Sequence, residues 1–112
     1  MRRKAPRLWR FLVCAALLSA ACAAVPEEVR REPHAGIASL WRGFLGMPPE
    51  RALAIAGNPD GRWVGAASGG HVSQLEAEQS ALAECRERRA TRRMQVPCRL
   101  YATGEAIVWG RR

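Results

Sequence analysis

The residues that could carry out chemistry are few and lie in the second half of the sequence. Ser68 and His71 are close enough for the histidine to act as a base toward the serine hydroxyl, as nucleophilic catalysis requires. The intervening Gly69-Gly70 pair would hold that histidine loosely, and it lacks the further glycines and the lysine of a phosphate-binding loop. We therefore expect no catalytic site, with a hydrolase built on Ser68 and His71 as an alternative.

Cysteine offers a second kind of chemistry. Cys85 and Cys98 with one nearby histidine do not supply the three or four ligands of a metal site, so we expect neither a metal nor a cofactor. Cys14 and Cys22 belong to the N-terminal apolar stretch, which leaves Cys85 and Cys98 for the domain. In an exported domain such a pair is most simply a disulfide, and the chain-entropy model gives it ~3 kcal/mol.

Arginine forms the third group. Arg88, Arg89, Arg92 and Arg93 lie near the end of a predicted helix, where positive charge interacts favourably with the helix dipole. A solvated helix end therefore explains them. The alternative is a site for a polyanion or another ligand, formed by these four residues and nearby aromatic side chains such as Trp63.

The net charge is concentrated at the N-terminal end. The whole chain carries +8, but five of its 18 basic residues lie within residues 1–10, and the rest of the chain carries +3. A strongly basic domain would suggest a nucleic-acid partner, and the remaining charge is too small for that inference. We do not expect binding to nucleic acid.

Residues 1–24 have the layout of a secretory signal peptide, with a basic start followed by an apolar run. The run is shorter than the ~20 residues that a membrane-spanning helix needs. Residues 18–22 resemble a lipobox, which predicts cleavage before Cys22 and a lipid on that cysteine; an ordinary signal peptidase site is the alternative. We expect an exported protein, either periplasmic or anchored to the membrane as a lipoprotein.

Residues 25–50 read as a tether followed by an apolar arm. Gly36, Gly43 and Gly46 argue against a stable helix in this arm, so we expect it to be loosely ordered. Trp41 and Phe44 either pack on the core or form an exposed surface for a partner.

The compact domain is expected at residues 51–110. Residues 51–56 and 62–67 read as two strands of a hairpin, with Leu53 and Ile55 on one face and alanine on the other. Ser73 and Glu76 form a capping box that starts a helix, which ends between residues 90 and 95. Glu78 falls on the apolar face of this helix, either at its edge or buried as a functional acid.

The last part of the domain is expected to form two more strands. Residues 98–103 alternate, with Cys98, Leu100 and Ala102 facing the helix and Tyr101 on the other side. A Gly104-Glu105 turn then leads into a strand at residues 106–109. The predicted fold is α+β, a small β-β-α-β-β domain with one helix packed on a short antiparallel sheet and a helix–strand disulfide.

Residues 51–109 resemble the short alanine-rich domains of unknown function found in exported proteins of proteobacteria. The similarity rests on the Glu-Ala-Glu-x-x-Ala-Leu-x-x-Cys pattern that ends at Cys85 and on Pro97-Cys98. It implies a Cys85–Cys98 disulfide and a location outside the cytoplasm, and it brings no catalytic residues. The arginine-rich segment at residues 86–93 departs from the family pattern, because such domains more often have a short glycine-containing loop there.

These observations favour a non-enzymatic envelope protein, a binding or accessory module whose protein partner is unknown. A lipid on Cys22 would anchor it to the membrane. The alternative is a domain that binds a polyanion or another ligand through the arginines of residues 86–93.

Overall fold

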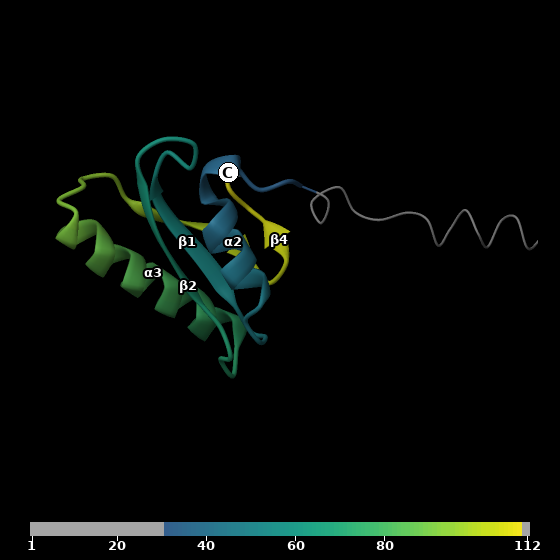
Figure 1. Ribbon diagram of the computed structural model, residues 1–112. Helices are drawn as coiled ribbons and strands as arrows, with labels where there is room; N and C mark the ends of the chain where they lie inside the picture. The colour runs from purple at the N-terminus through teal and green to yellow at the C-terminus, as the bar shows by residue number, and fades with distance from the viewer. Residues whose placement is uncertain (1–30, 111–112) are drawn as a thin grey trace, which may run out of the picture. The chain divides into compact units, whose positions relative to one another are not determined.

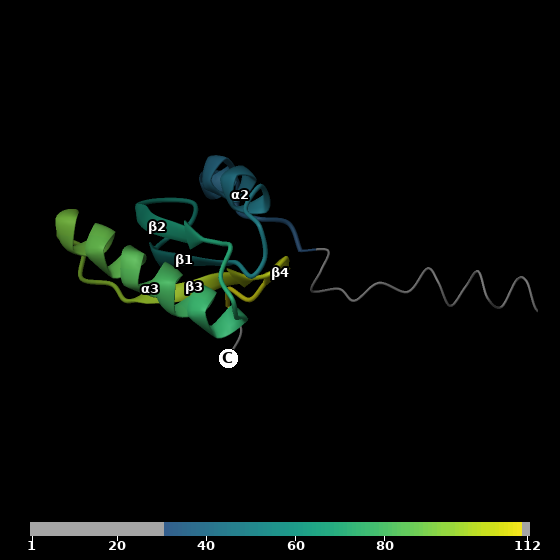
Figure 2. The same cartoon turned by 90° about the horizontal axis from the view of Figure 1, so that it is seen from below.

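The computed structural model describes residues 31–110, so the expected signal peptide, Cys22 and the start of the tether lie outside the described residues. The described chain forms a four-stranded antiparallel sheet in the order β2-β1-β3-β4. Helix α3 covers one face of the sheet and helix α2 the other, as Figures 1 and 2 show. The elements are η2 (Ala35–Ile37), α2 (Ala38–Leu45), β1 (Ala52–Gly57), β2 (Trp63–Ser68), α3 (Gln74–Thr91), β3 (Cys98–Thr103) and β4 (Ala106–Ile107).

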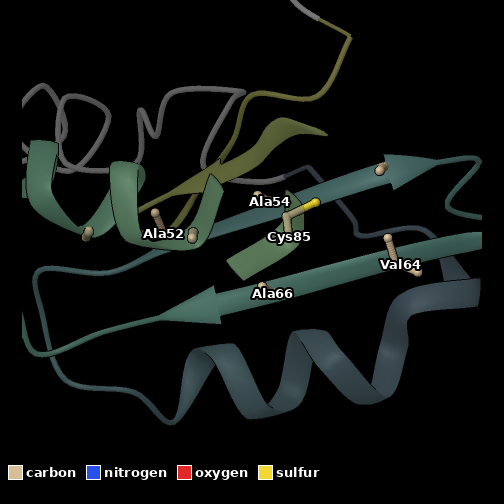
Figure 3. Packing of buried hydrophobic residues seen from close by; sticks show 8 residues of the cluster. Ala52, Ala54, Val64, Ala66 and Cys85 are labelled. Carbon is tan, nitrogen blue, oxygen red and sulfur yellow. The ribbon is translucent and has the colours of Figure 1, made fainter. Parts of the chain in front are cut away.

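The face of the sheet beneath α3 consists mainly of alanine, with Val64 and Leu100 as its larger side chains. Ala52, Ala54 and Ala66 are fully buried there against Ala77 and Ala81 of α3 (Figure 3). Side chains this short let the helix lie close to the strands. The predicted hairpin, with alanine on one face of β1, is confirmed.

A disulfide joins this helix to the sheet. Cys85 of α3 and Cys98 of β3 are bonded, with their Cα atoms 6.1 Å apart, within the usual range for disulfides. The predicted α+β class, the β-β-α-β-β order and the helix–strand disulfide are therefore confirmed.

Local signals set the start of α3. The Ser73 hydroxyl accepts a hydrogen bond from the backbone N–H of Glu76 at 3.1 Å, which confirms the predicted cap. Val72 and Leu75 do not help to bury the first turn, because they are 90% and 64% exposed. In this helix only Ala77, Ala81 and Cys85 are fully buried. Their short side chains pack against the alanine-rich face of the sheet.

The apolar arm is ordered, contrary to expectation. Residues 35–45 form η2 and α2, and Ile37 and Phe44 are fully buried. Trp41 is half-buried beside Phe44, with the ring centroids 5.4 Å apart. These side chains cover Leu53 and Ile55, the large residues of β1 that α3 does not touch, so burial outweighs the low helix propensity of the glycines.

Gly65 allows α2 to approach the sheet closely. A Cβ atom at this position would lie 2.9 Å from Cδ2 of Leu40 and 2.6 Å from Cδ1 of Ile55. Arg51 then holds the end of α2, because its guanidinium donates to the carbonyl oxygens of Leu45 and Met47 at 2.8 Å each.

A β-bulge breaks the alternation predicted for β3. Leu53 pairs with Ala102 but the next residue, Ala54, pairs with Leu100, so Tyr101 is an extra residue in β3. Leu100 faces α3 as predicted, whereas Ala102 packs with Leu53 on the α2 face, contrary to expectation. Tyr101, which was expected opposite the core, is fully buried under α2.

Contacts with β3 and β4 fasten the beginning of the domain. The backbone N–H of His34 donates to the Tyr101 hydroxyl at 2.9 Å, and Nδ1 of His34 lies 2.7 Å from the same oxygen. Arg31 donates to the carbonyl oxygens of Ile107 and Trp109 at 3.2 and 3.1 Å. The expected Gly104-Glu105 turn is present, since Thr103 pairs with Ala106.

The last strand is shorter than predicted. It comprises Ala106 and Ile107 only, because the next two amides, of Val108 and Trp109, both donate to the carbonyl oxygen of Tyr101. This convergence turns the chain away from β3.

Candidate functional site

The predicted binding arginines gather where α3 ends, but they point in different directions. Arg88 donates to the carbonyl oxygen of Gly65 in β2. Arg89 donates to the carbonyl oxygen of Val96, at 3.1 Å, in the loop that follows the helix. Both guanidinium groups therefore help to hold the loop and the strand at this end of the domain.

Helix α3 ends in a Schellman motif built on arginine. The N–H of Arg93 donates to Ala90 O at 3.0 Å and the N–H of Met94 to Arg89 O at 3.1 Å, the two bonds that define the motif. Arg93 has a φ of 54°, in the left-handed region that normally favours glycine. A non-glycine residue there costs roughly 1–2 kcal/mol. Residues held in such conformations cluster at functional sites.

Arg93 lines an open groove, which we call the arginine groove. It has a volume of about 730 Å³. Arg62 and Arg99 also line it, and its apolar wall includes Met94 and Trp109. The full lining is Gly57, Asn58, Arg62, Arg93, Met94, Gln95, Val96, Pro97, Arg99 and Trp109.

Trp109 fixes one of the positive charges in this groove. The guanidinium carbon of Arg99 lies 4.3 Å from the centroid of the Trp109 ring, a cation–π contact. The tryptophan is half-buried, so it contributes both an apolar surface and an electrostatic partner. No carboxylate lines the arginine groove, and a ligand there would meet only positive charge.

The second groove, which we call the edge groove, runs between β2 and α3. Trp63, Arg88 and Arg92 line it together with Glu87. The remaining lining residues are Val64, Gly65 and Thr91. Arg62 joins the two grooves, because it lines the first and donates to Arg92 O at 3.1 Å.

The binding residues predicted from the sequence do not form one site but line different grooves. Trp63, Arg88 and Arg92 line the edge groove, while Arg93 lines the arginine groove. Arg89 lines a smaller hollow, of about 460 Å³, that it shares with Arg93.

Sequence reasoning missed Arg62 and Arg99. Arg62 precedes β2 and Arg99 is in β3, so neither is near α3 in the sequence. The predicted topology could have indicated them. When a hairpin and a closing strand pack on one helix, the ends of these strands lie beside the end of the helix.

Ser68 and His71 do come together. The Ser68 hydroxyl oxygen lies 2.6 Å from Nε2 of His71 and 2.8 Å from the hydroxyl oxygen of Ser80 in α3. Ser68 is only 8% exposed, and the backbone of His71 exchanges two hydrogen bonds with Glu50, at 3.3 Å each. None of these four residues lines the grooves described above. The contacts fasten β2 to α3 and to the chain before β1.

The remaining candidates have structural positions. Cys85 and Cys98 are consumed in the disulfide, so neither offers a thiolate. Glu78 is half-buried, at the edge of the helix contact. Tyr101 is fully buried and therefore offers no surface to a ligand.

Residues 31–110 contain neither a metal-binding cluster nor a membrane-spanning helix. No three His, Cys, Asp or Glu side chains of this region come close enough together to bind a metal ion. The helices in the same region are too short or too polar to cross a membrane. Comparisons with family models, curated proteins and solved structures returned no match to the chain.

Proposed function

We propose that this protein is a non-enzymatic binding module of the bacterial envelope, and that the arginine groove binds an anionic ligand with an apolar portion. The observation that carries the proposal is the conformation of Arg93. Glycine would adopt the left-handed conformation at this helix end without strain, yet the residue is an arginine whose side chain lines the groove. The cost in stability suggests that the charge is kept for binding.

The composition of the groove supports an amphipathic ligand. Arg62, Arg93 and Arg99 supply charges from three separate segments, and guanidinium groups pair well with carboxylate, phosphate or sulfate. Met94 and Trp109 offer an apolar wall beside them. A ligand that carries an anionic group on an aromatic or aliphatic body would satisfy both.

The expected export fits this function. The signal peptide at residues 1–24 and a lipid on Cys22 would place the module in the periplasm or on a membrane surface, with the domain joined to it through residues 25–30. Fractionation of cells would test this. A Cys22→Ala variant that partitions into detergent like the unchanged chain would argue against lipidation.

Replacing Arg93 by glycine should separate stability from binding. We expect Arg93→Gly to stabilise the domain by about 1 kcal/mol, because glycine relieves the left-handed conformation. The same variant should bind anionic probes more weakly, by roughly 10- to 150-fold for one lost charged hydrogen bond. Anilinonaphthalene sulfonate, an aromatic anion, and heparin are suitable probes, measured by fluorescence and calorimetry over a range of salt concentrations.

Arg86→Ala is the matched control. Arg86 is an exposed residue of α3 that lines neither groove, so its loss removes the same charge without altering the arginine groove. Equal weakening by both substitutions would mean that only net charge matters. Unchanged binding by Arg93→Gly would overturn the proposal.

A further inference from the structure

Strand β2 is an edge of the sheet, and its hydrogen-bonding pattern shows which backbone groups face outward. The N–H of Asn58 donates to Arg62 O at 3.0 Å, so position 62 is directed toward β1. Antiparallel pairing alternates, so every second residue after it is also directed toward β1. The residues whose N–H and C=O groups are directed away from the sheet are therefore Trp63, Gly65 and Ala67.

Arg88 provides independent evidence for this direction. Its guanidinium donates to the carbonyl oxygen of Gly65 from outside the sheet. A long side chain thus occupies a position where the N–H of an added strand would lie. The Arg88 side chain is attached to an exposed helix position, so it can leave the carbonyl without disturbing the core.

The edge groove has the form of a strand-binding site. One wall is the outer edge of β2 and the other is the last two turns of α3, with Trp63 at one end. Peptides that add a strand to an exposed sheet edge gain affinity from main-chain hydrogen bonds and selectivity from the neighbouring side chains. Here those side chains are Arg88, Arg92, Thr91 and Glu87.

The positive charge of the edge groove indicates which kind of segment would bind there. Arg88 and Arg92 line the edge groove, and Arg62 adjoins it through its hydrogen bond to Arg92 O, whereas Glu87 is the one carboxylate in the lining. A second copy paired through β2 would bring the arginines of both copies together, which like-charge repulsion disfavours. An extended segment rich in Asp or Glu would instead find cations along its length.

We propose that an acidic, extended segment of a partner protein binds in the edge groove and extends the sheet as a strand beside β2. Its N–H groups replace Arg88 at the carbonyl of Gly65, and the released guanidinium pairs with a carboxylate of the segment. This site lies outside the arginine groove, so the proposal goes beyond the function proposed above.

Backbone methylation of a probe peptide tests the proposal directly. The probe is a short peptide of alternating Glu and Thr. Two control peptides have the same sequence and charge, but carry N-methyl groups either on all Glu or on all Thr residues. Only one of these two sets of amides can face β2 in an added strand. We expect one methylated peptide to lose affinity by on the order of 100-fold, for about three hydrogen bonds, and the other to bind nearly as well as the parent.

Amide hydrogen exchange of the protein supplies a second measurement. Binding of the parent peptide should slow exchange at Gly65 and Ala67, and Arg92→Ala should weaken binding more than Arg86→Ala. Equal binding of all three peptides would mean attraction by charge alone and would overturn strand addition. So would the absence of peptide binding, or dimerisation of the free protein through β2. None of these results would alter the effect of Arg93→Gly on the aromatic anion, which tests the arginine groove separately.

Discussion

The sheet presents small residues to α3 and large residues to α2. Beneath α3 the sheet contributes mainly Ala52, Ala54, Ala56 and Ala66, with Val64 and Leu100 as larger residues, and a covalent bond between Cys85 and Cys98 adds to the attachment. On the α2 face the sheet contributes the larger buried residues Leu53, Ile55, Tyr101 and Ile107, and Ile37 of η2 and Phe44 of α2 pack on them. The long helix is thus attached by packing together with a disulfide, and the short helix without a covalent bond. Variants can measure what each kind of attachment contributes.

The largest effect is expected on the α2 face. Phe44→Ala should lower the free energy of unfolding by about 3–5 kcal/mol, because it removes a fully buried aromatic side chain and leaves a cavity. Denaturant unfolding followed by circular dichroism measures this change. Leu45→Ala is the control, since its side chain is 45% exposed and its loss should cost about 0.5 kcal/mol. Similar losses for both variants would show that α2 contributes little to the core.

The second effect concerns the α3 face. Reduction of the disulfide, or its removal in the Cys85→Ala, Cys98→Ala double variant, should destabilise the domain by about 3 kcal/mol. Unfolding with and without a reducing agent measures the loss. If a reducing agent does not shift the unfolding midpoint of the wild-type protein, packing on the alanines suffices to hold α3.

The smallest effect depends on pH and is confined to the α2 face. Burial raises the pKa of the Tyr101 hydroxyl, while the hydrogen bond from His34 and the nearby charge of Arg31 act in the opposite direction. The unfolded chain therefore loses this proton first, and stability should fall as the pH rises above about 10. Below that pH Tyr101 is protonated in both states and its contribution is constant.

Tyrosinate absorbance can follow this titration, because Tyr101 is the only tyrosine in the chain. In Tyr101→Phe the fall in stability above about pH 10 should be absent, although this variant loses about 1 kcal/mol at neutral pH with its hydrogen bonds to His34. The same decline in Tyr101→Phe would assign the alkaline transition to another group.

The parts of the fold that local signals determine were predictable. The Ser73 cap and the Gly104-Glu105 turn depend on a few neighbouring residues, and the disulfide was expected because Cys85 and Cys98 are the two cysteines of the domain. Helix α2 was missed because its glycines oppose it locally, and tertiary burial of Phe44 overrides them. The missed signal was in β1, where Leu53 and Ile55 required a cover that α3 does not provide.

The bulge and the grooves depend on information that no periodic pattern contains. An extra residue at Tyr101 shifts the register of β3, so strict alternation placed Ala102 on the wrong face. The arginine groove likewise combines α3 with Arg62 and Arg99, whose proximity follows from strand order. That Arg93 would adopt a left-handed conformation could not be read from its residue type, since glycine is the usual choice.

The hydrogen bonds from Arg31 to Ile107 and Trp109 bring the beginning and the end of the described domain together. Domains with adjacent ends tolerate circular permutation and insertion into loops of other proteins. A permuted chain that joins residue 110 to residue 31 and opens at the exposed Asp60–Gly61 turn should therefore retain the fold. The domain could likewise be inserted into a loop of another protein, because its two ends lie next to each other.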